Sequence, residues 1–143
     1  MPRIKLVIPE RSFASVIIPV RVSDINYGNH VGNDAFVSIL QEARMQWLQS
    51  HGYTELNIEG LGLIMSDLAI EYKSESFYGD TIEVTLSAGE ITNAGFEIFY
   101  RLFTRRNGET MLLAKAKTGM VCYDYGIKKV SVLPEKLKHL LMG

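Results

Sequence analysis

One long helical pattern, followed mainly by strand patterns, constrains the fold of this chain more than any other feature. Residues 34–51 contain no Gly or Pro, and their apolar side chains recur at helical spacing, at Phe36, Leu40, Ala43 and Trp47. Polar residues fall on other faces of this helix, at Gln41, Arg44, Gln46 and Gln49. A lone helix of this length can bury its apolar stripe only against a curved sheet. We therefore predict an α+β fold in which a curved antiparallel sheet wraps around the helix.

Strand patterns occupy most of the remaining chain. Segment 13–22 is rich in β-branched residues, but Pro19 removes one ladder donor, so this strand should lie at a sheet edge or contain a bulge. After the helix, apolar and polar residues alternate, which predicts strands at 63–72, 80–90, 94–104 and 110–123, and a short one near 128–132. Asn107-Gly108 predicts a hairpin turn between the last two long strands.

The ends of the helices have their own signals. Asn33 or Asp34 could cap the long helix, which should end near Gly52. Pro134 suits the first position of a short terminal helix, because that position needs no N–H donor. This terminal helix carries Leu137, Leu140 and Leu141.

Length and composition exclude several classes of protein. The 143 residues are enough for one hydrophobic core, so we expect residues 1–143 to form a single domain. A net charge of -1 leaves no overall field to hold a nucleic acid. The single Cys122 cannot form an internal disulfide, and no compact His and Cys set suits a structural zinc site, so we expect no metal. No apolar run reaches the ~18 residues of a membrane span and no signal peptide is evident, which predicts a cytoplasmic protein.

Segment 96–103 carries bulky apolar side chains on both of its faces. One face can pack against the helix, and the other can meet a partner subunit. We therefore expect a homo-oligomer, either a homodimer or a homotetramer. A partly apolar outer face on a monomer is the alternative.

The most informative stretch runs from Arg21 to Phe36 and continues on the helix as Gln41-Glu42-Ala43-Arg44. It resembles the 4-hydroxybenzoyl-CoA thioesterase type of hot-dog protein and its acyl-ACP thioesterase relatives, where a strand ends in D-x-D-x-x-x-H-V-N-N-x-x-Y and the helix continues as E-E-A-R. The residues that match in register are Asp24, His30, Val31, Asn33, Glu42, Ala43 and Arg44, and a looser match extends to about Tyr123. The resemblance implies a hot-dog fold and hydrolysis of an acyl-CoA or acyl-ACP thioester, with no cofactor.

Three positions depart from the family pattern. The second acid of D-x-D, usually the catalytic carboxylate of the family, is Asn26 in this sequence. Gly32 replaces an Asn, and Phe36 replaces the Tyr. An amide cannot act as a nucleophile or general base in the manner of a carboxylate. The family mechanism therefore carries over only in part.

Thioester hydrolysis needs an attacking oxygen, a group that accepts its proton, and donors aimed at the developing oxyanion. The start of the helix offers free N–H groups and the positive end of a dipole, so we expect the substrate near Gly28, Asn33 and Asp34. The catalytic candidates close to this place are Asp24, Asn26, His30 and Glu42, the last on a partly apolar helix face that would favour a raised pKa.

Each candidate also has a purely structural explanation. Asp34 can act as a helix cap, and Glu42 can pair with a distant base. Asp24 either bears the charge that position 26 lacks or holds Asn26 and His30 in place, and either Asx side chain can simply satisfy loop amides. His30 is the strongest candidate, because it can activate water or donate a hydrogen bond to the substrate.

Two lysines on one predicted strand are secondary candidates. Lys115 and Lys117 alternate with alanines, so both ammonium groups point the same way and could meet the phosphates of CoA. A solvated strand face is the simpler explanation of both lysines.

Two other functions stay open. A hot-dog hydratase or dehydratase carries D-x-N-P-x-H, but here Asn26 is followed by Tyr27 and His30 lies six residues after Asp24 instead of five. A non-catalytic acyl-CoA or acyl-carrier binding protein would have kept the cleft and lost the acid at position 26. Turnover of a panel of thioesters separates the three functions.

Overall fold

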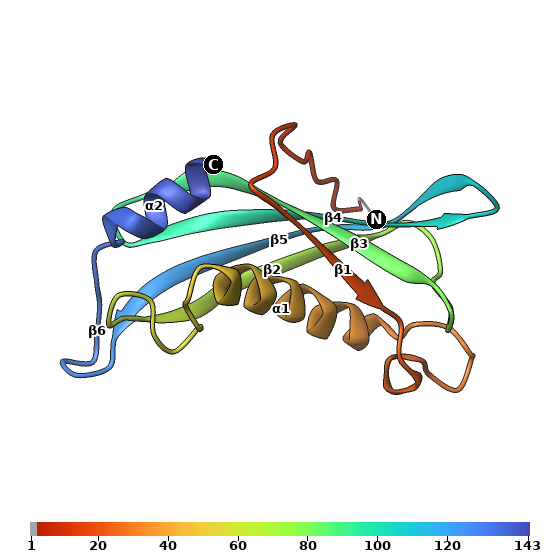
Figure 1. Ribbon diagram of the computed structural model, residues 1–143, viewed down its shortest axis with the longest axis horizontal. Helices are drawn as coiled ribbons and strands as arrows, with labels where there is room; N and C mark the ends of the chain where they lie inside the picture. Colours follow the sequence, from red (N-terminus) through yellow and green to blue (C-terminus); the bar gives the residue numbers. More distant parts are fainter. Residues whose placement is uncertain (1–2) are drawn as a thin grey trace.

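The computed structural model describes residues 3–143, whose strands form one six-stranded antiparallel sheet (Figure 1). The strands are β1 (Ala14–Pro19), β2 (Gly62–Tyr72), β3 (Thr81–Ile91), β4 (Gly95–Arg106), β5 (Glu109–Asp124) and β6 (Lys129–Val130). Their order is β1-β3-β4-β5-β2, and β6 pairs with β5. The helices are α1 (Asn33–Ser50) and α2 (Glu135–Met142), and a short 3-10 turn, η1 (Val22–Asp24), follows β1.

Helix α1 lies along one face of this sheet (Figure 1) and buries its apolar stripe there. The buried residues of α1 include the predicted Phe36, Leu40, Ala43 and Trp47. The sheet side of the same core is made of alternate residues of the central strands, among them Ile82, Val84, Leu86, Ile98, Tyr100 and Leu102. Each such large side chain stabilises the fold by about 1.5–3 kcal/mol when it is fully buried. The predicted α+β arrangement of one long helix against a curved antiparallel sheet is confirmed.

The ends of the sheet and its main hairpin also follow the sequence pattern. Strand β1, which contains Pro19, is an edge strand as predicted, and β2 is the other edge. Asn107 and Gly108 both have positive φ, 52° and 78°, as a two-residue hairpin turn between β4 and β5 requires.

Three local expectations were wrong. The N-cap of α1 is Gly32, and neither Asn33 nor Asp34 caps the helix. A Cβ at position 32 would lie 2.7 Å from Asp34 Oδ1, so a side chain at this position would have to displace the Asp34 carboxylate. Pro134 is the N-cap of α2 instead of its first helical residue. Arg44, expected on a polar face, is 4% exposed, because an ion pair and a hydrogen bond compensate its burial.

The N-terminal segment is bonded to the outer face of the sheet, the one away from α1. The N–H of Leu6 donates to the Glu71 carboxylate, and Lys115 Nζ donates to the Leu6 carbonyl. No helix among residues 3–143 is long and apolar enough to cross a membrane.

Candidate active site

The loop between η1 and α1 is a tight turn built around Asn26. The side-chain oxygen of Asn26 accepts the N–H of Gly28 at 2.9 Å, and the backbone N–H of Asn26 donates to the His30 carbonyl at 2.9 Å. Asn29 takes a left-handed conformation, with φ of 66°, which Asn adopts more readily than most residues. The turn therefore brings residues 26 and 30 to its two sides.

A second loop, residues 73–80, holds this turn from the other side. His30 forms an isolated β-bridge with Phe77, and the Val31 N–H donates to the Ser76 carbonyl at 2.7 Å. Asp80 ties this second loop to β4 through two hydrogen bonds from Arg106. Burial alone would raise the pKa of Asp80, but hydrogen bonds from Arg106, the Phe77 N–H and the Ser76 hydroxyl hold it below its usual value.

His30 has one ring nitrogen engaged and the other turned toward the turn. Nδ1 lies 3.2 Å from the Val31 carbonyl oxygen, which can only accept, so in the neutral ring Nδ1 carries the hydrogen. Nε2 then holds the free lone pair. A Cβ built on Gly28 would lie 3.4 Å from His30 Nε2 and 3.2 Å from Asn26 Oδ1, so the structure brings Gly28, Asn26 and His30 together.

Asp24 lies beneath this turn and is only 5% exposed. Its carboxylate accepts from the Arg21 backbone N–H at 2.8 Å and from the Arg21 guanidinium at 3.1 and 3.2 Å. Its carbonyl accepts the N–H of Gly32, the N-cap of α1. Both carboxylate oxygens are thus occupied, which suits a residue that fixes the turn more than one that takes a proton from water.

The first turn of α1 presents unpaired donors beside His30. Among the described residues, no hydrogen-bond partner is found for the backbone N–H of Asn33, Asp34 or Ala35. Asn33 and Asp34 are exposed, and the helix dipole adds positive potential at this point. Free N–H groups at a helix N-terminus are suited to stabilising a developing negative charge.

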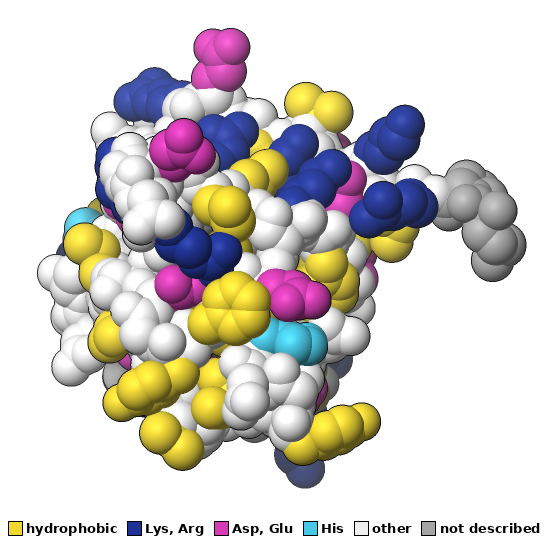
Figure 2. Space-filling model, turned by 90° about the vertical axis from the view of Figure 1, so that its right-hand side faces the viewer, with side chains coloured by type: hydrophobic (Ala, Val, Ile, Leu, Met, Phe, Trp, Pro, Cys, Tyr) yellow, Lys and Arg dark blue, Asp and Glu magenta, His cyan; other side chains and the backbone are white. Residues whose placement is uncertain are grey.

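A cavity of ≈260 Å³ opens at this end of the molecule. It is lined by His30, Val31, Asn33, Phe36 and residues 72–75. Figure 2 shows Lys and Arg side chains gathered on the upper part of this end. In residues 3–143, no group of three His, Cys, Asp or Glu side chains could hold a metal ion.

Tyr72 also lines this cavity. The sequence did not single it out as a site residue. Its hydroxyl donates to the Asn33 carbonyl at 2.9 Å, and its ring packs edge-on against Phe36 at 5.5 Å. Burial, aided by the charge of Asp34, raises the pKa of the Tyr72 phenol. Two sequence signals could have suggested this contact: Tyr72 ends a predicted strand, and it falls within the looser match to the family.

The structure does not bring Glu42 to His30. Glu42 lies nine residues into α1, about 13 Å from the helix start at 1.5 Å per residue. Its carboxylate accepts a hydrogen bond from Gln46 at 2.8 Å, and it lines a shallow hollow with Gln46, Gln49 and Ser50.

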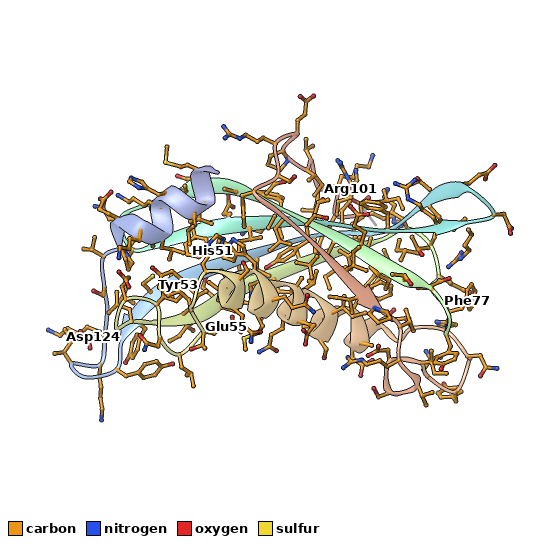
Figure 3. All side chains as sticks on the ribbon, viewed as in Figure 1. His51, Tyr53, Glu55, Phe77, Arg101 and Asp124 are labelled. Carbon is orange, nitrogen blue, oxygen red and sulfur yellow. The ribbon has the colours of Figure 1, made fainter. Side chains whose placement is uncertain are left out.

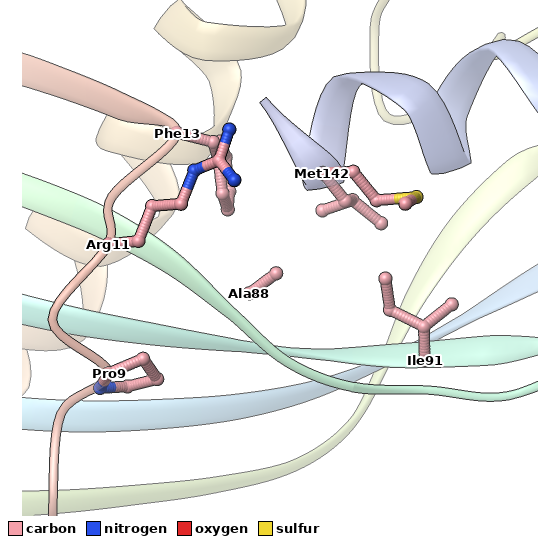
Figure 4. Close-up of a pocket in the computed structure, with 7 residues that line it drawn as sticks. Pro9, Arg11, Phe13, Ala88, Ile91 and Met142 are labelled. Atoms are coloured by element: carbon pink, nitrogen blue, oxygen red, sulfur yellow. The ribbon is translucent and has the colours of Figure 1, made fainter.

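Lys115 and Lys117 also lie apart from His30, on the outer face of the sheet. Lys117 Nζ pairs with Asp67 at 2.9 Å and with Glu97 at 3.4 Å. Lys115 Nζ donates to the Leu6 carbonyl. A further cavity, of ≈290 Å³, lies between the N-terminal segment, β3 and α2 (Figure 4), and none of the predicted site residues lines it.

Comparison with known proteins identifies related chains and folds. A family model described as Thioesterase-like superfamily matches residues 20–141. The chain is 28% identical over 125 residues to acyl-CoA thioesterase YbgC of Haemophilus influenzae, and this match covers 84% of the chain and 89% of that protein.

Solved structures give the same fold. A 1,4-dihydroxy-2-naphthoyl-CoA thioesterase from Synechocystis has a TM-score of 0.78 at 22% identity, over 90% of this chain and 94% of that one. A variant of 4-hydroxybenzoyl-CoA thioesterase in complex with 4-hydroxybenzoyl-CoA has a TM-score of 0.78 at 14% identity, over 90% and 97% of the two chains. These likenesses confirm the predicted hot-dog fold.

Proposed function

The chain belongs to the thioesterase-like superfamily, and on this premise we propose that it hydrolyses acyl-CoA thioesters with His30 as the general base. The similarity to an acyl-CoA thioesterase at 28% identity supports the activity. The observation that carries the role of His30 is its contact with the Val31 carbonyl, which leaves the Nε2 lone pair free beside the first turn of α1.

The reaction then follows from the chemistry of these groups. Nε2 of His30 takes a proton from water as the water oxygen forms a bond to the thioester carbon. The carbonyl oxygen becomes an oxyanion that the free N–H groups of the first turn of α1 stabilise. When the carbon–sulfur bond breaks, the imidazolium returns the proton to the leaving sulfur, which gives a carboxylic acid and free CoA.

Asn26 takes a donor role in this mechanism. Its Oδ1 already accepts the Gly28 N–H, which leaves the Nδ2 amide hydrogens for the substrate or the oxyanion. Asp24 is a positioning residue, since it holds Arg21 and the N-cap Gly32. Asp34 adds a negative charge near the first turn, where it interacts with the dipole.

The carrier of the acyl group would bind beside the first turn of α1. We place the thioester near Gly28, Asn33 and Asp34. Of these residues, Asn33 lines the cavity beside His30, and Gly28 lies next to the His30 ring. We keep Lys115 and Lys117, which lie on the outer face of the sheet apart from His30, as candidate contacts for the phosphates of CoA. An acyl-ACP substrate would present a phosphopantetheine arm with the same thioester.

We further propose that the protein is a cytoplasmic homodimer or homotetramer. The exposed edge strand β2 supports assembly, since it presents Met65 at 41% and Leu68 at 36% exposure. Light scattering after size exclusion measures the mass, and a monomer at micromolar concentration would contradict this part. Cell fractionation tests the compartment.

A panel of acyl-CoA thioesters tests the activity. We expect release of free CoA thiol from at least one thioester, and its loss in His30→Gln. Hydration of an enoyl-CoA without thiol release would instead indicate a hydratase. Tight binding of acyl-CoA with no product of either kind would indicate a binding protein.

A further inference from the structure

The Tyr72 side chain bonds the sheet to the first residue of α1. Tyr72 is the last residue of β2, and its hydroxyl donates to the carbonyl oxygen of Asn33, the first residue of α1, at 2.9 Å. Figure 3 shows Phe77, which pairs with His30, at the end of the molecule where α1 begins, and Asp124 at the opposite end. The contact therefore lies at the same end of the molecule as the candidate active site.

The carbonyl that Tyr72 bonds is directly joined to one of the free N–H groups of α1. The Asn33 carbonyl and the Asp34 N–H belong to one peptide unit, which is planar and trans. In such a unit the carbonyl and the N–H point in opposite directions, so a partner that fixes one also fixes the other. Within residues 3–143, the Asp34 N–H has no hydrogen-bond partner. Tyr72 thus sets the direction of a donor that stays available to an oxyanion.

A hydrogen bond to the carbonyl also changes the strength of the N–H as a donor. It draws electron density toward the oxygen and leaves the N–H more positive, and such cooperativity strengthens linked hydrogen bonds by roughly 10–30% each. The carbonyl has two lone pairs, so it can accept from Tyr72 in addition to a bond within the helix. Among the free N–H groups of residues 33–35, only that of Asp34 shares its peptide unit with a carbonyl that, in the described part of the chain, accepts a side-chain donor.

The Tyr72 side chain is held in place by its own neighbours. Its ring packs edge-on against Phe36 at 5.5 Å. Its backbone pairs with Ala114 of β5, and its carbonyl accepts from Arg3 at 3.3 Å. Because the ring and the backbone are both fixed, the hydroxyl is preorganised toward the Asn33 carbonyl.

The phenol of Tyr72 stays in the form that can donate. Only a protonated phenol donates to a carbonyl. Burial, aided by the charge of Asp34, raises the pKa of Tyr72 above its ordinary value of about 10. The contact with Asn33 therefore persists at neutral and mildly alkaline pH.

We propose that Tyr72 is a positioning residue that acts through the Asn33 carbonyl to orient and polarise the Asp34 N–H, and that this N–H is the principal donor to the oxyanion. The inference rests on the proposed thioesterase function. Since an oxyanion forms only as the reaction proceeds, the Tyr72 hydroxyl should affect the transition state more than the binding of the substrate.

Removal of the hydroxyl is the first test. Tyr72→Phe keeps the ring against Phe36 and loses only the bond to Asn33. We expect kcat to fall at least threefold with KM within twofold, because a lost hydrogen bond corresponds to about two- to tenfold in rate. A smaller loss of kcat overturns the inference. Tyr78→Phe is the matched control, since Tyr78 is 63% exposed, and it should leave kcat and KM within twofold.

Two acyl-CoA analogues distinguish a donor to the oxyanion from a wall of the cavity. A thioether analogue resembles the substrate but forms no oxyanion. A fluorinated ketone analogue forms a readily ionised hydrate that resembles the tetrahedral intermediate. Tyr72→Phe should weaken binding of the ketone at least threefold and that of the thioether less than twofold. Equal weakening of both would mean that Tyr72 only shapes the cavity, which overturns the inference.

A double-mutant cycle tests whether Tyr72 acts through Asp34. Asp34→Pro removes the N–H at a position in the first turn, where a helix tolerates proline. It should lower kcat by about 10²–10³-fold, as the loss of one oxyanion donor does. In that background Tyr72→Phe should cost less than twofold, and additive losses would overturn the inference. If Asp34→Pro does not fold, the comparison of the two analogues decides by itself.

A spectroscopic readout distinguishes failure of the inference from failure of the function. The amide nitrogen resonance of a residue responds to hydrogen bonding at the preceding carbonyl. In Tyr72→Phe, the resonance of Asp34 should move upfield while that of Ala35 stays in place. If the wild-type protein hydrolyses no thioester, the proposed function fails, and this resonance still decides whether Tyr72 acts on the Asn33–Asp34 peptide. An unmoved Asp34 resonance overturns the inference whatever the activity.

Discussion

The imidazole Nδ1 of His30 lies 3.2 Å from the carbonyl oxygen of the next residue, Val31, whose own N–H is bonded to Ser76. The carbonyl fixes the tautomer of the neutral ring, and the Ser76 contact fixes the carbonyl. His30→Gln removes the lone pair of Nε2 and should lower kcat/KM by about 10²–10⁴-fold, the usual contribution of a general base. Steady-state assays of CoA thiol release measure this loss of kcat/KM.

Thermal unfolding of the same variant is the control. The ring of His30 is only partly buried, so we expect the melting temperature of His30→Gln to stay close to that of the wild type. A variant that melts early yet keeps its kcat/KM per folded molecule would remove His30 from the mechanism.

The amide of Asn26 gives the second prediction. Asn26→Asp keeps the acceptor for the Gly28 N–H but loses the Nδ2 donors and places a negative charge where the oxyanion forms. We expect kcat to fall at least tenfold with the turn preserved. A rise in kcat above the wild-type value would show instead that the carboxylate usual in the family can still work here as the base.

Asp24 gives the third prediction. Asp24→Asn weakens the bonds to Arg21, so we expect the free energy of unfolding to fall by about 1–3 kcal/mol, as for a buried group that loses its partners. Since the turn carries His30, kcat should fall at least tenfold while KM changes little. Activity and denaturant titrations measure both effects. Unchanged kcat in a destabilised protein would limit Asp24 to a structural role.

The fold could be predicted because its signals are local. The helical spacing of Phe36 to Trp47, the alternation in the strands and the Asn107-Gly108 turn each act within a few residues. The cap at Gly32 and the burial of Arg44 could not be predicted. The cap lies against Asp34 Oδ1, and the buried Arg44 is bonded to Glu55 and Tyr100, and only the folded chain brings these groups close.

The candidate site divides in the same way. Asn26, Gly28 and His30 lie within one turn, so their spacing in the sequence was enough to group them. Tyr72 reaches the site from a strand 39 residues beyond Asn33, and no local pattern records that contact. Glu42 shares the helix with the site, but the rise along α1 separates it from His30.

The position of Glu42 leads to the fourth prediction. Glu42→Gln should leave kcat/KM within about twofold, because its carboxylate is bonded to Gln46 on a part of α1 distant from the first turn. Gln46→Ala, which frees the same carboxylate, is the companion variant and should also leave kcat/KM within about twofold. A tenfold loss in Glu42→Gln with normal stability would restore Glu42 as the base.

The last prediction concerns Asp80 and Arg106, which hold the loop that carries Phe77. The carboxylate of Asp80 has a lowered pKa in the folded protein, so its charged form stabilises the fold above the unfolded pKa of about 3.9, and this stability is lost as the pH falls through the lower folded pKa. Asp80→Asn should therefore melt earlier than the wild type at pH 7, and the difference should shrink below about pH 4. Melting curves of both proteins across this range measure the effect. Because the loop contacts His30 and Val31, Asp80→Asn should also lower kcat at pH 7. Asp124→Asn, at the end of β5, keeps the side-chain oxygen that accepts the Gly126 N–H and should do neither. A melting difference that persists unchanged in acid would mean that packing, and not the charge of Asp80, holds this loop.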